Sequence, residues 1–284
     1  MEKRVPRGSD NQMRAHNGVI NPDKYYERIK RLNIDHYAGE VPYYMHASLR
    51  EVEKVLLKKL RPGSRLLDLG CGAGRFSVGA AMYGFDVLGV DITPEAIFAA
   101  ENKAKGLKAK FIVGDMTSLK LENEKFDYVF CPRFSINAIA TRQQRKKAVS
   151  GMIRVADRSG LVFIESFNKH YLRKGYFLKN TIRDFLIRVR IFVCWVTGRE
   201  YTGLLPGDIT YKTNKVDIAP DGYAHLPTVS ELRRLIPEGV HYRLYSIPQI
   251  VGAKKFDIFK YFRYSIWIVI GISKEALLLF DNKT

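Results

Sequence analysis

Three glycines and three acidic residues occupy positions from which they could bind a small polar ligand. Gly70, Gly72 and Gly74 come directly after the apolar run 65–69, and a helical pattern begins after them. Glycine lets the backbone turn tightly and approach a ligand closely, and the start of a helix offers free N–H groups to an anion. An ordinary strand-to-helix turn explains three glycines at alternate positions poorly. The spacing therefore predicts a ligand-binding loop.

An acidic residue stands near the end of each of three predicted strands. Asp68 precedes the first glycine by two residues, Asp91 ends the second strand, and Asp115 follows the third with Met116 beside it. A carboxylate at Asp91 could accept both hydroxyls of a ribose, and one at Asp115 could accept from an adenine amino group. A single such aspartate often only caps a helix. Three of them indicate a binding site, because ligands bind parallel sheets at the carboxyl ends of the strands.

A dinucleotide is the rival ligand for the glycine loop. Its fingerprint is Gly-x-Gly-x-x-Gly, but Arg75 stands where the third glycine would be. Asp68 also suits a ligand with an ammonium group better than it suits a pyrophosphate. Both observations disfavour the dinucleotide.

The segments around these residues alternate between strand and helix patterns. Apolar runs predict strands over 65–69, 85–90, 109–113, 126–131 and 160–165, and later over 242–247 and 264–272. Helical periodicity predicts helices over 76–82, 94–105, 143–156, 177–196 and 229–235. Strands that alternate with helices predict an α/β fold with a doubly wound sheet, since parallel crossovers are right-handed.

Composition limits the classes of protein and of partner. The 284 residues include 47 Lys and Arg against 29 Asp and Glu, a net charge of +18, and such a surface attracts phosphates, anionic lipids and acidic substrates. Cys71, Cys131 and Cys194 lack the spacing of a disulfide scaffold or a cysteine zinc site, and no metal is expected. No apolar run approaches the roughly 18 residues of a membrane span. We expect a cytoplasmic protein.

At this point the chain resembles the class I (Rossmann-like) S-adenosylmethionine-dependent methyltransferases. The resemblance covers residues 45–166 and extends more weakly over 228–273. It rests on the stretches LLDLGCGAGRFS, VLGVDITPEAI, FIVGDM, FDYVFC and GLVFIES, in that order. It implies a seven-stranded sheet of order 3-2-1-4-5-7-6 whose seventh strand is antiparallel. The almost wholly apolar run 264–272 fits that central strand.

The resemblance also implies how S-adenosyl-L-methionine would be held. The glycine loop would pack against the methionine portion, Asp68 would hold its amino group, and Asp91 would bind the ribose. The adenine would contact Ile92, Asp115 and Met116, and Cys131 would face the sulfonium region as a small apolar wall. The implied cofactor-binding residues are Asp68, Gly70, Cys71, Gly72, Gly74, Asp91, Ile92, Asp115, Met116 and Cys131.

Four residues are candidates for the acceptor side. Arg133 in the loop after the fourth strand could clamp an acidic group and Asn137 could orient a polar one, although a surface arginine is an equally simple interpretation. Glu165 ends the fifth strand and could hold an acceptor group or pair with Arg133. His225 could act as a base, but such a histidine is more often a polar loop residue. A base is optional, because displacement from a sulfonium produces a leaving group that needs no proton.

The chain divides into five expected segments around this core. They are a flexible terminus over 1–22, a tyrosine-rich helical cover over 23–60, the cofactor-binding core over 61–166, a basic lid insertion over 167–227, and the rest of the core sheet over 228–284. Segment 169–199 carries a net charge of +7 and one apolar helical face, which we expect to be buried against the body as a lid. RNA and an anionic membrane surface are alternative partners for this segment and for 254–263.

The leading function is methyl transfer to an O or N atom of a small molecule with an acidic or polar group. The alternative is a tRNA or rRNA methyltransferase that uses the basic surface. A third hypothesis, outside catalysis, is a partner subunit that binds the cofactor without acting on it. The sequence does not indicate the oligomeric state.

Overall fold

One mixed sheet forms the centre of the molecule. The computed structural model describes residues 19–171, 176–211, 221–253, 257 and 259–282, and within them this sheet has seven strands. In spatial order they are β3 (Ala109–Val113), β2 (Asp86–Asp91), β1 (Arg65–Leu69), β4 (Phe126–Cys131), β5 (Ala156–Phe167), β9 (Ser265–Gly271) and β8 (His241–Tyr245). The first five are parallel, and β9 runs antiparallel to both of its neighbours. Along the chain, β8 and β9 are the sixth and seventh strands of this sheet, because β6 and β7 form a separate sheet. The expected strand order 3-2-1-4-5-7-6 is therefore confirmed.

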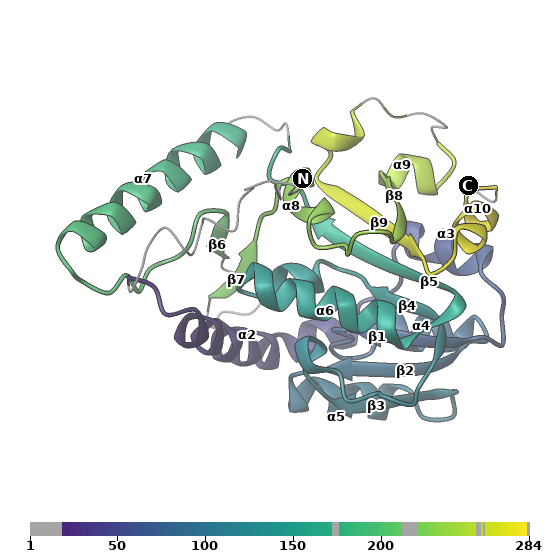
Figure 1. The fold of residues 1–284 in the computed structure, drawn as a ribbon. Helices are drawn as coiled ribbons and strands as arrows, with labels where there is room; N and C mark the ends of the chain where they lie inside the picture. Colours follow the sequence, from purple (N-terminus) through teal and green to yellow (C-terminus); the bar gives the residue numbers. More distant parts are fainter. Residues whose placement is uncertain (1–18, 172–175, 212–220, 254–256, 258, 283–284) are drawn as a thin grey trace.

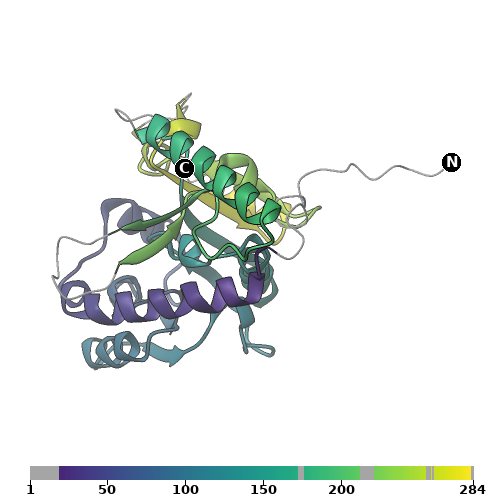
Figure 2. The same cartoon turned by 90° about the vertical axis from the view of Figure 1, so that its left-hand side faces the viewer.

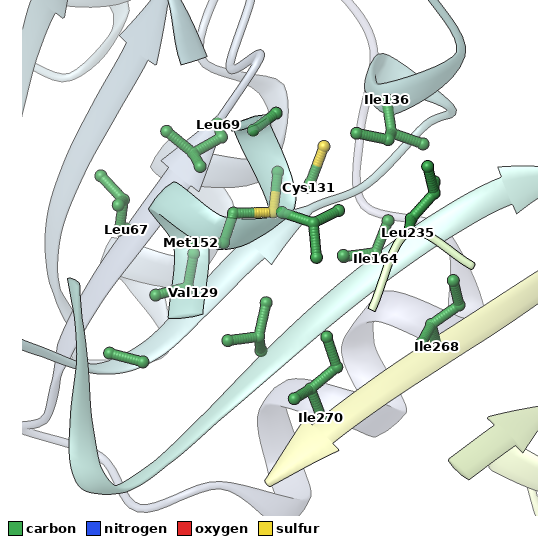
Figure 3. Packing of buried hydrophobic residues seen from close by; sticks show 14 of the residues in the cluster. Leu67, Leu69, Val129, Cys131, Ile136, Met152, Ile164, Leu235, Ile268 and Ile270 are labelled. Carbon is green, nitrogen blue, oxygen red and sulfur yellow. The ribbon is translucent and has the colours of Figure 1, made fainter. Parts of the chain in front are cut away.

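Helices cover both faces of this sheet (Figure 1). One face packs against α3 (Glu51–Lys59), α4 (Arg75–Met82) and α10 (Lys274–Asp281), and the other packs against α6 (Arg142–Val155) and α8 (Val229–Arg233). Side chains of β4 alternate between these layers, with Val129 and Cys131 toward α6 and Phe130 toward α4. Figure 3 shows the α6 layer, in which Met152 lies beside Val129 and Cys131. All seven residues of β9 are buried, as expected of a strand inserted into the middle of a sheet.

The predicted N-terminal cover is a pair of helices. The longer one, α2 (Pro22–Met45), begins at Asn21, whose side chain accepts the N–H groups of Asp23 and Lys24. It contacts α5 (Pro94–Lys103) and a small hairpin of β6 (Asp208–Tyr211) and β7 (Gly222–His225). Figure 2 shows α2 running between this hairpin and α5. The hairpin was not predicted, because two four-residue strands give little periodic signal.

Helix α7 (Tyr176–Val196) is present as predicted, but the expected burial of its apolar face is wrong. The large apolar residues of that face are all exposed: Ile182, Phe185, Leu186, Val189, Phe192, Val193 and Val196. The side toward the body instead carries Asn180, Asp184, Ile187 and Ile191. This side of α7 faces the body because Lys169 and Arg183 pair with the Asp184 carboxylate, which also accepts the Gly207 N–H.

Part of the two predicted basic surfaces lies outside the described residues. In segment 169–199, Arg173 and Lys174 are outside the described residues. In segment 254–263, residues 254–256 and 258 are outside them. Within 259–263, Phe259 is exposed and Arg263 pairs with the buried Asp257 at 3.1 Å. In the described part of the chain, no helix is long and apolar enough to cross a membrane.

Candidate active site

A cavity of about 600 Å³ lies at the carboxyl ends of β1, β2, β3 and β4. Such a volume suits a cofactor or a drug-sized ligand. Its floor is the glycine loop between β1 and α4, and its roof consists of α2 and the β6–β7 hairpin. No residue of α7 lines it, so within the described residues the hairpin takes the covering position that was expected of that helix.

Most residues predicted from the sequence to bind a cofactor line this cavity. Those on its wall are Asp68, Gly70, Cys71, Gly72, Asp91, Ile92, Asp115 and Met116. Gly74 and Cys131 are not on the wall. A Cβ at Gly74 would lie 3.0 Å from that of Ala100, so this glycine allows α4 to approach α5, and Cys131 is wholly buried in the core. The parallel strands bring the predicted acids together because all of them end at the same edge.

The glycine loop has the shape that its sequence predicts. Gly70 and Gly72 have φ of +74° and +51°, a region that side chains rarely adopt. A Cβ at Gly70 would come within 2.5 Å of Ser135, so the space there admits only glycine. A Cβ at Gly72 would meet nothing within 4 Å and would project into open space at the cavity. The loop thus presents bare backbone at Gly72.

Asp68 offers a buried acceptor to the cavity. One carboxylate oxygen accepts the Ser77 hydroxyl at 2.6 Å, and the other, Oδ1, has no partner among the described residues. Burial raises the pKa of Asp68 to about 7. A buried carboxylate with an unused oxygen is a fitting partner for a ligand's ammonium group, because that group would satisfy the oxygen and favour the ionised form.

Asp91 is held in one orientation at the end of β2. Its two oxygens accept the N–H groups of Gly72 at 2.8 Å and of Thr93 at 2.9 Å. Each carboxylate oxygen has a second lone pair, so both can still accept from a ligand. Burial raises the pKa of this group. The arrangement fits a pair of neighbouring hydroxyls, such as those of a ribose.

Asp115 joins the cavity floor to the α2 roof. Its carboxylate accepts the Tyr26 hydroxyl and the Lys30 ammonium, each at 2.9 Å, and the Thr117 N–H at 2.8 Å. Burial alone would raise the pKa of Asp115, but the hydrogen bonds from Lys30 and Thr117 lower it below its usual range. Sequence reasoning did not single out Lys30, since nothing local links it to a residue 85 positions away.

The far end of the cavity is aromatic and carries one exposed cation. Arg133 and Phe134 both have positive φ, +53° and +66°, which costs energy in residues with side chains. The Phe134 ring stacks on Phe167 with centroids 3.8 Å apart, and this contact holds the loop. Tyr44 and Tyr211 line the same end.

Comparison with known proteins finds a methyltransferase match in the core of the chain. Residues 60–189 match the family model described as a methyltransferase domain. A 2-methyl-6-phytyl-1,4-hydroquinone methyltransferase of Synechocystis is 28% identical over 164 residues, which are 54% of this chain and 50% of that protein. A putative ribosomal RNA large subunit methyltransferase of Methanocaldococcus jannaschii is 30% identical over 151 residues, 47% of this chain and 37% of that protein. The chain thus spans half or less of the length of these relatives.

A solved structure shows the same fold. The SAM-dependent methyltransferase of Methanosarcina mazei superposes with a TM-score of 0.56 at 21% identity, over 78% of this chain and 97% of that one. One part of the chain, residues 60–189, is a methyltransferase domain, and the sheet has the strand order of the class I S-adenosylmethionine-dependent methyltransferases. The cofactor of this methyltransferase family is S-adenosyl-L-methionine. The unused oxygen of Asp68 and the bare backbone at Gly72 fit its amino acid portion, and the fixed carboxylate of Asp91 fits its ribose.

Of the four predicted acceptor-side residues, Arg133 alone lines the cavity. Glu165 is fully buried and pairs with Arg50 at 2.5 Å, so it does not pair with the Arg133 side chain. One of its oxygens instead accepts the backbone N–H of Arg133 at 2.8 Å. Glu165 therefore holds the loop after β4 in place, and it does not line the cavity.

Asn137 and His225 lie in the protein interior. Asn137 donates to Ser166 and to the His225 carbonyl and accepts the Phe167 N–H, so both of its polar atoms are used by protein partners. The His225 ring contacts Asp208 at 2.7 Å, and burial lowers the pKa of the imidazole. These contacts join the segment after β4 to β5 and to the β6–β7 hairpin. They lend no support to an acceptor role for either residue.

Sequence reasoning missed a chain of charged residues that begins at the start of α4, directly after the glycine loop. The Arg75 guanidinium lines the cavity and donates to both oxygens of Glu53, at 2.5 and 2.7 Å. Glu53 also accepts from Arg50, which in turn pairs with Glu165. The only sequence signal was the arginine that replaces the third glycine of the dinucleotide fingerprint.

Proposed function

We propose that this protein transfers the methyl group of S-adenosylmethionine to an oxygen or nitrogen of a small molecule that has a flat apolar body and an acidic or polar group. The observation that carries the proposal is the aromatic end of the cavity, where Tyr44, Phe134 and Tyr211 line the wall near the exposed cation of Arg133. Rings of this kind pack against a flat apolar body, and a guanidinium pairs with an acidic group.

In this proposal the chain contributes orientation more than acid–base chemistry. The bound cofactor supplies a methyl group that is electrophilic because it is attached to a sulfonium. The glycine loop and Asp91 would fix the cofactor, and Arg133 and the surrounding rings would place the acceptor atom in line with the sulfur–carbon bond. Such orientation can supply up to roughly 7–11 kcal/mol of the barrier. The acceptor's proton would pass to water, so no residue of the wall needs to act as a base.

The experiment that tests the proposal separates acceptor classes. The protein is incubated with methyl-labelled S-adenosylmethionine and either a metabolite extract or total RNA, and the products are fractionated by mass. We expect label in low-mass products alone. Label in RNA would favour the second candidate, an RNA methyltransferase, which draws on the net charge of +18 and on the ribosomal RNA methyltransferase relative. Label in neither fraction would contradict both.

We expect cofactor affinity to fall in mild acid. The cofactor's ammonium group would bind the ionised form of Asp68, whose pKa burial raises to about 7. Below that pH the free protein must lose a proton to bind, so affinity should weaken toward a limit of about tenfold per pH unit, and it should level off above pH 7. Calorimetry across about pH 5.5 to 8 checks this. In Asp68→Asn the slope should flatten, and an equally steep slope in that variant would contradict the assignment.

Arg133→Ala should lower methyl transfer while leaving cofactor binding within about twofold of the parent. Losing a charge-assisted hydrogen bond costs about 1.5–3 kcal/mol, which is roughly ten- to a hundredfold in kcat/KM for an acidic acceptor. Arg133→Gly separates the side chain from the backbone, because glycine relaxes at a φ of +53° and alanine does not. Equal losses in both variants would assign the effect to the guanidinium. The matched control is the exposed Arg158→Ala, and unchanged turnover in both Arg133 variants would contradict the proposed role.

A further inference from the structure

Helix α7 turns a broad apolar side away from the protein. Its buried positions Asn180, Asp184, Ile187 and Ile191 are at most 6% exposed. Because a helix advances about 100° per residue, the opposite side is formed by a second set of residues. That set is Leu178, Ile182, Phe185, Leu186, Val189, Phe192, Val193 and Val196, each between 42% and 64% exposed. We refer to these eight residues as the outer face of α7.

The outer face lies at the edge of the molecule. In Figures 1 and 2, α7 runs along the periphery beyond the β6–β7 hairpin, with no other element on its outward side. Single exposed apolar residues are normal on a protein surface, but a contiguous stripe along the length of a helix marks an interaction site. Trp195, 51% exposed, extends the apolar character at the end of the helix.

Cations border the outer face on both sides. Lys179 and Arg190 lie along one border and Arg188 along the other, and all three are exposed. The single acid of α7, Asp184, is buried and paired with Lys169 and Arg183. In the described part of α7, the exposed side chains are therefore mainly apolar, and every exposed charge is positive.

We propose that α7 binds the surface of an anionic lipid bilayer, lying parallel to it with the outer face among the lipid headgroups. Helices that lie in a bilayer surface have an apolar face bordered by Lys and Arg, which extend their charges to the lipid phosphates. A second copy of this chain would bring the same cations against one another. An RNA that approached this side of α7 would contact the apolar centre of the outer face before the cations at its borders.

Docking through α7 would also place the cavity near the membrane. The Asp184 carboxylate accepts the Gly207 N–H at 3.1 Å, and Gly207 immediately precedes the hairpin. Ile209 and Tyr211 of that hairpin line the cavity. The lipid-binding proposal goes beyond methyl transfer, and its test does not depend on methyltransferase activity.

Vesicle sedimentation with the full chain tests the proposal. We expect the protein to sediment with phosphatidylcholine–phosphatidylglycerol vesicles, to remain in the supernatant with phosphatidylcholine alone, and to be released as salt rises. The double variant Phe185→Ser/Phe192→Ser should weaken vesicle binding by about tenfold or more, because the variant lacks the free energy that each ring gains when it moves from water into the bilayer. Phe98→Ser on α5, where the side chain is 69% exposed, is the matched control and should bind like the parent.

A charge series completes the test. The triple variant Lys179→Gln/Arg188→Gln/Arg190→Gln should weaken binding to anionic vesicles by about fivefold per cation, roughly a hundredfold in all. Lys146→Gln/Lys147→Gln on the exposed side of α6 should have a much smaller effect. Failure to sediment with anionic vesicles would overturn the proposal, as would binding that the α7 variants leave unchanged. A dimer in light scattering that the serine variant dissociates, or RNA binding that the charge variant alone abolishes while vesicles are ignored, would equally overturn it in favour of that partner.

Discussion

Replacing Glu53 by alanine should lower the free energy of unfolding by about 3–5 kcal/mol, the usual cost of leaving one partner of a buried ion pair alone. The Glu53 carboxylate is wholly buried and accepts hydrogen bonds from both Nη atoms of Arg75, whose side chain is 9% exposed. Burial alone would raise the pKa of Glu53, but Arg75 and Arg50 hold it below its usual range. Without this carboxylate, the Arg75 guanidinium keeps the Ser48 carbonyl as an acceptor but, among the described residues, has no other ion-pair partner.

Urea unfolding of matched variants measures this effect. Glu51→Ala is the control, because Glu51 lies on the same first turn of α3 with its side chain 70% exposed, and its loss should stay within about 0.5 kcal/mol. The double variant Glu53→Met/Arg75→Met should lose less than Glu53→Ala, since it removes both charges together. A loss below about 1 kcal/mol in Glu53→Ala would show that the pair adds little to stability.

Asp91→Ala should weaken binding of S-adenosylmethionine and of its demethylated product alike. Hydrogen bonds from two ribose hydroxyls to a charged acceptor are worth about 1.5–3 kcal/mol, so both dissociation constants should rise roughly ten- to a hundredfold. The glycine loop would also lose its anchor, because the Asp91 carboxylate accepts the Gly72 N–H. Both effects act on the bound cofactor and on the product in the same direction.

Calorimetry on Asp91→Ala and Asp86→Ala checks this expectation. Asp86 stands at the opposite, exposed end of the same strand, so its replacement controls for a change in β2 that does not touch the cavity. An unfolding curve for each variant verifies that the fold is retained. Parent-like affinity in a folded Asp91→Ala protein would remove this residue from the cofactor site.

The sheet and one wall of the cavity could be predicted because their signals are local. Apolar runs mark the strands, and glycines at alternate positions mark the loop, so Asp68, Asp91 and Asp115 fall on one edge once the strands are parallel. The strand order came from the resemblance to methyltransferases. Propensity and periodicity contain no information on which strands become neighbours.

The acceptor side was harder to predict because its residues are engaged by partners remote in sequence. Glu165 pairs with Arg50 across 115 positions, and Asn137 contacts His225 across 88. Residue type alone suggested chemistry for these side chains, whereas the fold uses them to fix loops. Helix α7 shows the same limit, since periodicity revealed two different sides but not which one faces the body.

The most direct test of the central claim is calorimetry of the unmodified chain with S-adenosylmethionine, its demethylated product and NADH. A cavity with an unused buried carboxylate oxygen at Asp68 and an arginine in place of the third glycine predicts micromolar-range binding of the first two ligands and none of NADH. Tight binding of NADH without binding of S-adenosylmethionine would contradict the account.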